Sequence, residues 1–563
     1  MKVIIVGGVA GGATAAARIR RLDEHAEITV FERSGYISYA NCGLPYYIGD
    51  VITDPEELTL QTPESFFKRF RINMKIHHEV ISIHPECKTV SVKNLENGEI
   101  FEENYDKLIL SPGAKPTQPR LPGVGMDKLF TLRTVEDTFR IKEYINKNHP
   151  KSAVLAGGGF IGLELAENLR ELGMDVTIVQ RPKQLMNPFD PDMASMIHNE
   201  MRKHGIKLVL GYTVEGFKEK DNGVEVLLKD NPSLQADMVV LAIGVTPDTA
   251  LAKEAGLELG IKGSIVVNDR METSVPDIYA AGDAVQVKHY VTGDDALISL
   301  AGPANKQGRI IADNICGGDS RYLGSQGSSV IKVFDMTAAT TGINETNAKK
   351  SGLEVDTVIL SPMSHAGYYP GGKVMTMKVV FEKETYRLLG AQIIGYEGVD
   401  KRIDVLATAI HAGLKATQLK DLDLAYAPPY SSAKDPVNMA GFMIDNIAKG
   451  TLKQWHLEDM DKISKDKSVV LLDVRTVGEF NRGHMDGFRN IPVDELRERI
   501  NEIEKGKPVY LICQSGLRSY IASRILEGNG YETYNFSGGF RFYDAVVNDR
   551  ALIERAYACG MDY

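Results

Sequence analysis

The chain has 563 residues, 43% of them hydrophobic and 25% charged, with a formal net charge of −10. These values are typical of a globular protein with several domains and give no reason to expect nucleic acid or an anionic membrane as a partner. No apolar run reaches the ~20 residues of a membrane-spanning helix, and the N-terminus resembles a strand rather than a signal peptide. Five scattered cysteines lack disulfide or metal-ligand spacing, which favours a cytoplasmic location and predicts no metal site.

The first elements in chain order form a dinucleotide-binding unit. A strand, a glycine-rich turn, a helix and a second strand are expected at Lys2–Val6, Gly7–Gly12, Ala13–Leu22 and Glu27–Phe31. The turn departs from G-x-G-x-x-G, because Val9 stands where the second glycine belongs. Glu32 compensates for this departure, since a carboxylate at the end of the second strand can bind ribose hydroxyls. We therefore expect a nucleotide at this turn.

The same order of elements recurs about 150 residues later. Strand, helix and strand are expected at 153–155, 163–172 and 176–179, and the turn Gly157–Gly162 carries a complete G-x-G-x-x-G. A plain glycine-rich turn is the alternative, but the flanking elements favour nucleotide binding. Gln180 and Arg181 stand where an NAD-binding site has an acid. An arginine there can pair with a 2′-phosphate and favours NADPH, although NADH stays usable and Arg181 can simply face solvent.

Three further apolar strands, 105–111, 238–243 and 277–281, are each stopped by glycine, and Asp283 after the last of them suits a flavin. From about residue 326 the pattern changes to strands and one helical stretch, 401–412. The segment 448–462, which holds the only tryptophan, is expected to be a connector. A second α/β stretch follows it to the C-terminus.

Cys42 has no partner thiol nearby. Disulfide reductases that use a flavin usually carry a second cysteine a few residues on, but Pro45 and Tyr47 occupy those positions. A lone thiol cannot close an internal disulfide, so its oxidised form is a mixed disulfide, a persulfide or a sulfenic acid. The substrate is therefore expected to be a small sulfur compound or a peroxide.

Two arginines share one face of the first helix. Arg18 and Arg21 are spaced i, i+3, and such pairs are usually only solvated. Because this helix begins at the expected flavin site, the two arginines are candidates for binding the phosphate of a phosphorylated substrate. Lys434 is a candidate for an additional contact to it.

A strand at 509–512 leads into the loop Cys513-Gln-Ser-Gly-Leu-Arg518 and then a helix. Backbone N–H groups and Arg518 are expected to surround the sulfur and favour a thiolate or persulfide. A phosphatase loop is the alternative, but the loop is one residue shorter than that, which suits sulfur better than phosphate. With Leu472-Asp473-Val-Arg475 and Gly483-His484, the loop resembles a rhodanese domain. Cys87, Cys316 and Cys559 have no such context and are expected to be structural or incidental.

Residues 1–446 resemble the coenzyme A-disulfide reductase branch of the flavin pyridine-nucleotide disulfide oxidoreductases, on the evidence of both glycine motifs, Asn41-Cys42, Gly282-Asp283 and two C-terminal tyrosines. The resemblance implies a homodimer that uses FAD, NADPH (or NADH) and coenzyme A. In it, Cys42 is redox-active, and Tyr368 and Tyr426 approach the substrate from the partner subunit. The rhodanese-like tail adds Cys513 and Arg518 as catalytic residues.

The resemblance also implies a set of binding residues. Those expected at the flavin are Gly7, Gly8, Val9, Ala10, Gly11, Gly12, Glu32, Arg33, Asn41, Val80, Ser111, Gly113, Arg133, Gly282, Asp283 and Ala301. Those expected at the nicotinamide cofactor are Gly157, Gly159, Phe160, Ile161, Gly162, Glu164, Gln180, Arg181 and Gly244. Those expected at coenzyme A are Thr14, Arg18, Arg21, Ser38, Asn41, Cys42, Arg71, Asn305, Arg309 and Lys434, with Arg18 at a position where the family varies.

The predicted fold class is α/β, with two Rossmann-like dinucleotide-binding domains, an α+β dimerisation domain and a C-terminal rhodanese-like α/β domain. The expected limits are 1–120 with 245–325 for FAD, 121–244 for NAD(P)H, 326–446 for dimerisation, 447–462 for a linker and 463–563 for the tail. The expected activity is reduction of coenzyme A disulfide, coenzyme A persulfide or polysulfide, with release of hydrogen sulfide. An NAD(P)H oxidase or peroxidase and a sulfur carrier or redox sensor with an inactive flavin domain are the alternatives.

Overall fold

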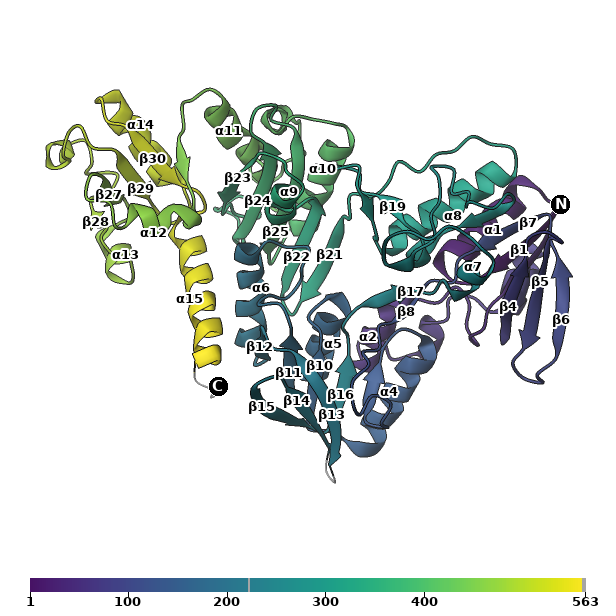
Figure 1. Cartoon of the computed structure of the whole chain (residues 1–563). Helices are drawn as coiled ribbons and strands as arrows, with labels where there is room; N and C mark the ends of the chain where they lie inside the picture. The colour runs from purple at the N-terminus through teal and green to yellow at the C-terminus, as the bar shows by residue number, and fades with distance from the viewer. Residues whose placement is uncertain (221–222, 559–563) are drawn as a thin grey trace. The chain divides into compact units, whose positions relative to one another are not determined.

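The computed structural model of the chain describes residues 1–220 and 223–558 (Figure 1). The chain divides into two units by its internal contacts. The first contains Met1–Pro182 with Gly205–Gly327, and the second contains Lys183–His204 with Ser328–Tyr563. Cys559 lies outside the described residues, so the expectation for it stays a prediction.

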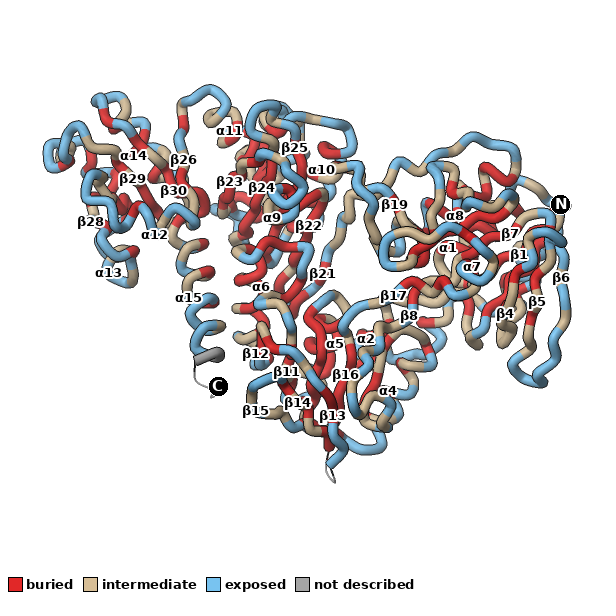
Figure 2. The backbone as a smooth tube through the Cα atoms, viewed as in Figure 1, coloured by how far each residue is buried: buried red, intermediate tan, exposed pale blue. Residues whose placement is uncertain are grey.

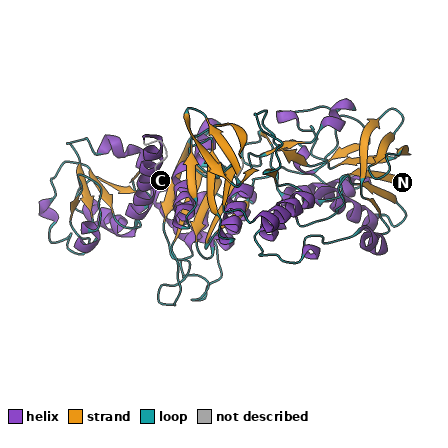
Figure 3. Cartoon of the chain, turned by 90° about the horizontal axis from the view of Figure 1, so that it is seen from below, coloured by secondary structure: helices purple, strands orange, loops and turns teal. Residues whose placement is uncertain are grey.

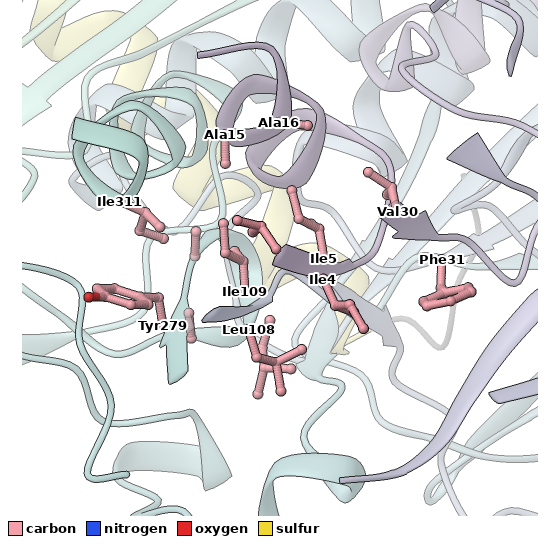
Figure 4. Packing of buried hydrophobic residues seen from close by; sticks show 14 of the residues in the cluster. Ile4, Ile5, Ala15, Ala16, Val30, Phe31, Leu108, Ile109, Tyr279 and Ile311 are labelled. Atoms are coloured by element: carbon pink, nitrogen blue, oxygen red, sulfur yellow. The ribbon is translucent and has the colours of Figure 1, made fainter. Parts of the chain in front are cut away.

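A five-stranded parallel sheet forms the core of the first unit. Its order is β18 (Ile278–Ala280), β7 (Lys107–Leu110), β1 (Lys2–Val6), β2 (Glu27–Phe31) and β3 (Asn73–Lys75). The central strand β1 is apolar on both faces, as a strand covered on both sides must be. Ile4 and Ile5 are fully buried, and Figure 4 shows them packed with Ala15 and Ala16 of α1 (Ala10–Leu22). Helix α8 (Ala301–Ile315) packs along α1.

A second five-stranded parallel sheet repeats this design. Its order is β12 (Lys207–Leu210), β11 (Asp175–Gln180), β10 (Ser152–Ala156), β16 (Met238–Leu241) and β9 (Leu129–Thr131). Helices α4 (Val135–Asn148) and α5 (Phe160–Glu171) flank it, and α5 packs against the short helix α2 (Leu44–Ile48). The two sheets place a glycine-rich turn at the carboxyl end of β1 and another at that of β10.

Smaller elements complete the first unit. The antiparallel sheets are β4–β6 (His78–His84, Thr89–Asn94, Ile100–Asn104) and β13–β15 (Val214–Lys220, Gly223–Leu228, Asn231–Ala236), and the two-stranded ribbons are β8–β17 (Ala114–Pro116, Val245–Pro247) and β19–β20 (Val287–Lys288, Asp295–Ala296). The remaining helices are α3 (Pro63–Phe70) and α7 (Ala250–Glu254).

The second unit begins with an antiparallel sheet whose strands are mostly buried (Figure 2). Its order is β21 (Ser329–Val333), β22 (Met336–Gly342), β25 (Leu388–Gly395), β24 (Met375–Glu382) and β23 (Val355–Leu360). The helices that belong with it are α6 (Pro191–Lys203), α9 (Glu345–Lys350), α10 (Val399–His411) and α11 (Pro436–Ala448). The predicted helical stretch at 401–412 corresponds to α10.

A parallel sheet in the order β26 (Gln454–Trp455), β30 (Thr533–Phe536), β29 (Val509–Ile512), β27 (Val470–Asp473) and β28 (Arg489–Asn490) completes the second unit. The helices that belong with it are α12 (Met460–Ile463), α13 (Val477–Asn481), α14 (Leu517–Gly528) and α15 (Gly539–Ala558). Figure 3 shows the strands of both units flanked by helices. Helix α15 runs beside α6 in Figure 1, and the Asn199 amide donates to the Ala545 carbonyl at 3.0 Å.

The structure differs from the expected linker 447–462. Gln454 and Trp455 form the edge strand β26, and Trp455 is 2% exposed against Phe536, with its ring nitrogen donating to the Leu511 carbonyl. A large aromatic ring contributes most to stability when it is buried, even where its neighbours in sequence are polar. The local sequence pattern does not reveal that Trp455 is buried in this way. The predicted α/β fold class, with its four kinds of domain, is confirmed, whereas the exact domain limits stay predictions.

Candidate functional site

Both glycine-rich turns leave room for an anion. Gly7 and Gly157 have φ of +96° and +120°, and a Cβ on either would lie 2.1–2.2 Å from a backbone carbonyl. Helices α1 and α5 begin within the turns, at Ala10 and Phe160, without a side-chain cap, so their first N–H groups have no side-chain acceptor at the cap. A Cβ on Gly159 would have no described atom within 4 Å beyond its own neighbours in the chain. Free donors at the positive end of a helix fit the pyrophosphate of a dinucleotide.

Glu32 orders the first turn. Its carboxylate accepts from the Gly8 N–H at 2.8 Å and from the Ser34 N–H at 2.9 Å. Burial raises its pKa, and the two backbone donors oppose the rise. The carboxylate therefore lies at the end of β2, where the sequence places the ribose contact, and that contact stays a prediction.

The structure brings three of the predicted flavin-site residues together beside Cys42. Arg133 donates to the Asp283 carboxylate at 2.6 Å. In the amide orientation that satisfies both residues, Asn41 donates to the Arg133 carbonyl and accepts from its guanidinium at 3.2–3.3 Å. Arg133 thus joins Asp283 to the turn that carries Cys42.

The other predicted flavin-site residues lie elsewhere in the same unit. Arg33 pairs with Asp248 at 2.9 Å, and the backbones of Gly113 and of Gly244, which is predicted at the nicotinamide cofactor, each accept a hydrogen bond near the β8–β17 ribbon. Val80 lies in β4, Ser111 follows β7, and Ala301 begins α8. Ser111 directly faces the first turn, since its carbonyl is the atom that a Cβ on Gly7 would meet.

Cys42 lies in the turn Asn41–Gly43 that leads into α2, and it reaches solvent. Partial burial of the thiol raises its pKa, Glu164 adds to the rise, and Arg133 opposes it. Glu164 has a pKa of about 7 because it is buried, with Glu167 adding to the rise, and its carboxylate is hydrogen-bonded to Tyr46. The chain alone therefore holds Cys42 as a neutral thiol beside a second group that can carry a proton.

The second glycine-rich turn is held by Gln180, whose side-chain oxygen accepts from the Gly158 N–H at 3.0 Å. Arg181 follows it and is exposed. Gln180 is the last residue of β11 and Arg181 follows it, at the position where the sequence predicts contact with the adenosine ribose.

The predicted coenzyme A residues gather in part along α1 and α8. The Thr14 hydroxyl donates to the Asn305 side chain at 2.5 Å. Arg18 forms an ion pair with Asp313 at 2.7 Å, and the Asp313 carboxylate also lies 4.0 Å from the Arg309 guanidinium. The sequence interpretation missed Asp313, and no local motif marks it. It partly neutralises Arg18 and Arg309, whereas Arg21 on α1 is exposed.

The remaining coenzyme A residues are more dispersed. The Ser38 N–H donates to the Gly8 carbonyl at 2.9 Å, which places Ser38 at the first turn. Arg71 caps α3 and lies over the Phe67 ring. Lys434 belongs to the second unit and is exposed.

Two exposed tyrosines form a pair in the second unit. The hydroxyls of Tyr368 and Tyr426 lie 2.7 Å apart, and the side chains are 76% and 45% exposed. The hydrogen bond with Tyr368 raises the pKa of Tyr426. Each hydroxyl contacts the other tyrosine, and both rings are exposed, so they can contact a group outside this unit.

Cys513 is buried at the end of β29, and its sulfur accepts from the Gly516 N–H at 3.1 Å and the Ser519 hydroxyl at 3.2 Å. Gly516 has φ +99°, which the tight loop requires. Arg518 lies within electrostatic reach of Cys513, and its place at the sulfur stays a prediction. Its guanidinium makes two hydrogen bonds of 2.7 Å to Glu479, and the pKa of Glu479 falls to about 2.

Glu479 is therefore a site residue that the sequence interpretation missed. Its signal is the Thr476-x-x-Glu479 capping box, which marks the start of α13 and fixes the carboxylate. Of the other cysteines, Cys87 is exposed, and burial raises the pKa of the half-buried Cys316. Within residues 1–220 and 223–558, none of the helices has the length and apolarity needed to cross a bilayer.

Comparison with protein families assigns three long parts of the chain. Residues 1–308 match the pyridine nucleotide-disulphide oxidoreductases, 328–436 the dimerisation domain of that family, and 456–545 the rhodanese-like domain. The coenzyme A disulfide reductase of Staphylococcus aureus is 39% identical over 78% of this chain and 99% of its own length.

Two solved structures are similar over nearly the whole chain. Reduced CoADR-RHD from Bacillus anthracis is 48% identical with a TM-score of 0.95, covering 98% of each chain. A NAD-dependent persulfide reductase from A. fulgidus is 38% identical with a TM-score of 0.90, covering 96% of this chain and all of its own. The chain therefore belongs to the pyridine nucleotide-disulphide oxidoreductase family, in the group that joins this fold to a dimerisation domain and a C-terminal rhodanese-like domain.

Proposed function

We propose that this enzyme uses NAD(P)H to reduce coenzyme A disulfide, coenzyme A persulfide or polysulfide through Cys42 alone. The observation that carries the proposal is the isolation of that thiol, because Pro45 and Tyr47 stand where a partner cysteine would lie. An isolated thiol turns over by forming and releasing a mixed disulfide or persulfide with its substrate. The names of the Staphylococcus aureus and A. fulgidus relatives support substrates of this class.

The cofactors fit the two turns described above. FAD would be held by the Gly7–Gly12 turn, Glu32 and Asp283, and NAD(P)H by the Gly157–Gly162 turn with Gln180 and Arg181. When bound, they supply the two electrons, whereas the protein supplies position and protons. The proposed balance is R–S–SH + NAD(P)H + H⁺ giving R–SH + H₂S + NAD(P)⁺.

The residues of the chain divide the remaining work. Cys42 attacks a sulfur of the substrate as a thiolate, and binding has to stabilise that thiolate, because the surroundings raise the thiol pKa. Tyr368 and Tyr426 of the partner subunit in a homodimer would hydrogen-bond the leaving thiolate and return a proton. Arg18, Arg21 and Arg309 would bind coenzyme A. Free catalytic thiols suit the reducing cytoplasm, where we place the reaction.

Cys513 would carry sulfane sulfur as a persulfide and pass it to coenzyme A beside Cys42. Joining the two domains in one chain raises the effective concentration of one site at the other. This favours sulfane sulfur over plain coenzyme A disulfide as the working substrate.

The test is anaerobic NADPH oxidation with coenzyme A persulfide against coenzyme A disulfide, with hydrogen sulfide quantified. We expect faster turnover on the persulfide, with one sulfide for each NADPH oxidised. Faster turnover on the disulfide would instead indicate a coenzyme A redox enzyme. Oxidation that needs only oxygen or peroxide would indicate the oxidase or peroxidase alternative, in which Cys42 becomes a sulfenic acid.

We also propose that Arg181 confers a preference for NADPH. Replacing Arg181 by alanine is expected to raise KM for NADPH about tenfold, the scale of one lost charge-assisted hydrogen-bonding contact, while KM for NADH changes little. Initial rates over a range of each cofactor measure this. Equal changes for both cofactors would show that Arg181 does not contact a 2′-phosphate.

A further inference from the structure

The arginines that line the sulfur site are already neutralised. Arg518 makes a two-point contact with Glu479, and Arg475 makes another with Asp473, with both Arg475 and Asp473 almost fully buried. Arg475 also lies 3.8 Å over the Phe540 ring. The cradle of Cys513 therefore contains two cations and two anions, and its paired groups carry no net charge.

Neutral groups hold the sulfur itself. The Gly516 N–H and the Ser519 hydroxyl are the donors to the Cys513 sulfur. The residue is 1% exposed, so only a small terminal atom of a donor can reach it from outside. Nothing in this set is adapted to a doubly charged group.

Two exposed apolar side chains lie on α14, the helix that begins at the sulfur loop. Leu517 directly follows Gly516 and is 60% exposed, and Ile521 lies one turn further on the same face of α14 and is 42% exposed. Arg541 is the exposed cation close to the loop, since its backbone N–H donates to the Gln514 carbonyl at 3.2 Å. Because its side chain is exposed, water and salt screen its charge.

From this arrangement we infer that Cys513 takes its sulfur from an alkyl persulfide, whose aliphatic arm lies on Leu517 and Ile521, in preference to thiosulfate, and that Glu479 sets this choice. The inference rests on the proposed function, because it names the sulfur donor of the second site. Glu479 touches no reacting atom and acts through Arg518, so it is a specificity-determining residue rather than a catalytic one.

The transfer step is balanced for either donor. The Cys513 thiolate attacks the sulfane sulfur, the S–S bond of the donor breaks, and the electron pair leaves on R–S⁻, which takes up a proton. The products are the Cys513 persulfide and R–SH. With thiosulfate the same attack releases sulfite, but the donor brings two negative charges to a cradle in which Glu479 stays ionised and holds Arg518.

The variant E479Q separates charge from structure. Glutamine can keep the capping box with Thr476 and one hydrogen bond to Arg518, but it removes the negative charge. E495Q is the matched control, because Glu495 forms an exposed ion pair with Arg499 elsewhere in the same domain. Full-length holoenzyme without NADPH would be mixed with glutathione persulfide, an alkyl persulfide other than that of the acceptor coenzyme A, or with thiosulfate. Persulfidation of the Cys513 peptide would be followed by mass spectrometry.

We expect the wild-type enzyme to react at least about tenfold faster with the persulfide. In E479Q the rate with thiosulfate should rise about tenfold, the scale of one freed charge-assisted pair, with the gain shrinking as salt is added. The rate with the persulfide should change less than about threefold, and E495Q should match the wild type with both donors. The inference would be overturned if the wild-type enzyme reacted faster with thiosulfate. It would also be overturned if E479Q left the thiosulfate rate unchanged, or changed the thiosulfate and persulfide rates by the same factor.

A second measurement distinguishes failure of this inference from failure of the proposed function. NADPH-dependent reduction of coenzyme A disulfide takes place at Cys42 and should be equal in E479Q and the wild type. If neither reduces a coenzyme A substrate, the proposed function fails whatever the donor ratio at Cys513. The variant L517S should slow the persulfide reaction alone, since it removes apolar surface without changing charge.

Discussion

Replacing Cys42 by serine is expected to lower NADPH-dependent reduction of coenzyme A disulfide or persulfide by roughly a thousandfold or more. A serine hydroxyl is a much weaker nucleophile than a thiolate and cannot form a sulfur–sulfur bond with the substrate. The flavin should stay bound, because its predicted contacts are the Gly7–Gly12 turn, Glu32 and Asp283. Anaerobic NADPH consumption gives the rate, and the visible absorption spectrum reports the flavin.

The chain offers matched controls for this variant. Cys316→Ser changes a half-buried thiol of the same unit that lies near Arg18 and Asp313, and it should leave the rate unchanged. Sulfur loading of Cys513 should also survive in Cys42→Ser, since that site has its own donors to sulfur. Persistent reduction in Cys42→Ser, with flavin bound, would contradict the assignment of Cys42 as the redox thiol.

The part of the site that the sequence predicts is the part built from short segments. The turns at Gly7 and Gly157 each lie between a strand and a helix that are adjacent in sequence, so periodicity and glycine spacing are sufficient to find them. The Cys513 loop is local in the same way, because β29, the loop and α14 follow one another directly.

The contacts that the sequence does not predict join distant residues. Asp313 pairs with Arg18, and Arg133 connects Asn41 to Asp283, across separations of 90 residues or more. Glu479 lies closer to Arg518, but its local motif explains only the start of α13. Such pairings depend on how the strands are ordered in a sheet, which a single sequence leaves open.

Lys378 is the clearest example of what the sequence pattern conceals. It lies in β24 among apolar residues, and its side chain is 2% exposed. Its ammonium group lies 2.7–3.2 Å from the carboxylates of Asp190, Asp192 and Glu345. Asp192 lies in α6, Asp190 directly precedes α6, and Glu345 lies in α9. The buried Lys378 in β24 therefore connects this strand to both of these helices in the second unit.

Replacing Lys378 by methionine is expected to destabilise the second unit by about 3–5 kcal/mol, because it leaves buried carboxylates without their cation. Chemical unfolding followed by circular dichroism measures the loss. The only tryptophan, Trp455, reports the C-terminal sheet separately by its fluorescence. Lys349→Met is the matched control, since Lys349 pairs with the same Glu345 but is half-exposed and should cost about 0–1 kcal/mol.

The pH dependence of this loss gives a second, independent readout. Burial alone would raise the pKa of Asp190 and Glu345, but Lys378 and the hydrogen bonds to each carboxylate outweigh it, so both pKa values are lowered. Carboxylates with a lowered pKa stabilise the wild-type fold above their unfolded pKa of about 4, and that contribution is lost as the pH falls further. In Lys378→Met the cation that counteracts the effect of burial is gone, so the pKa values of the buried carboxyl groups rise. These groups then take up protons as the pH falls from about 8 to 5, and the variant should gain stability over that range.

The difference in unfolding free energy between wild type and Lys378→Met should therefore be largest near pH 8 and narrow toward pH 5. The double variant Lys378→Met with Asp192→Asn removes one of the unpaired charges and should recover part of the loss at pH 8. A difference that is constant across this range, with no recovery in the double variant, would show that Lys378 stabilises the unit by packing rather than by its charge.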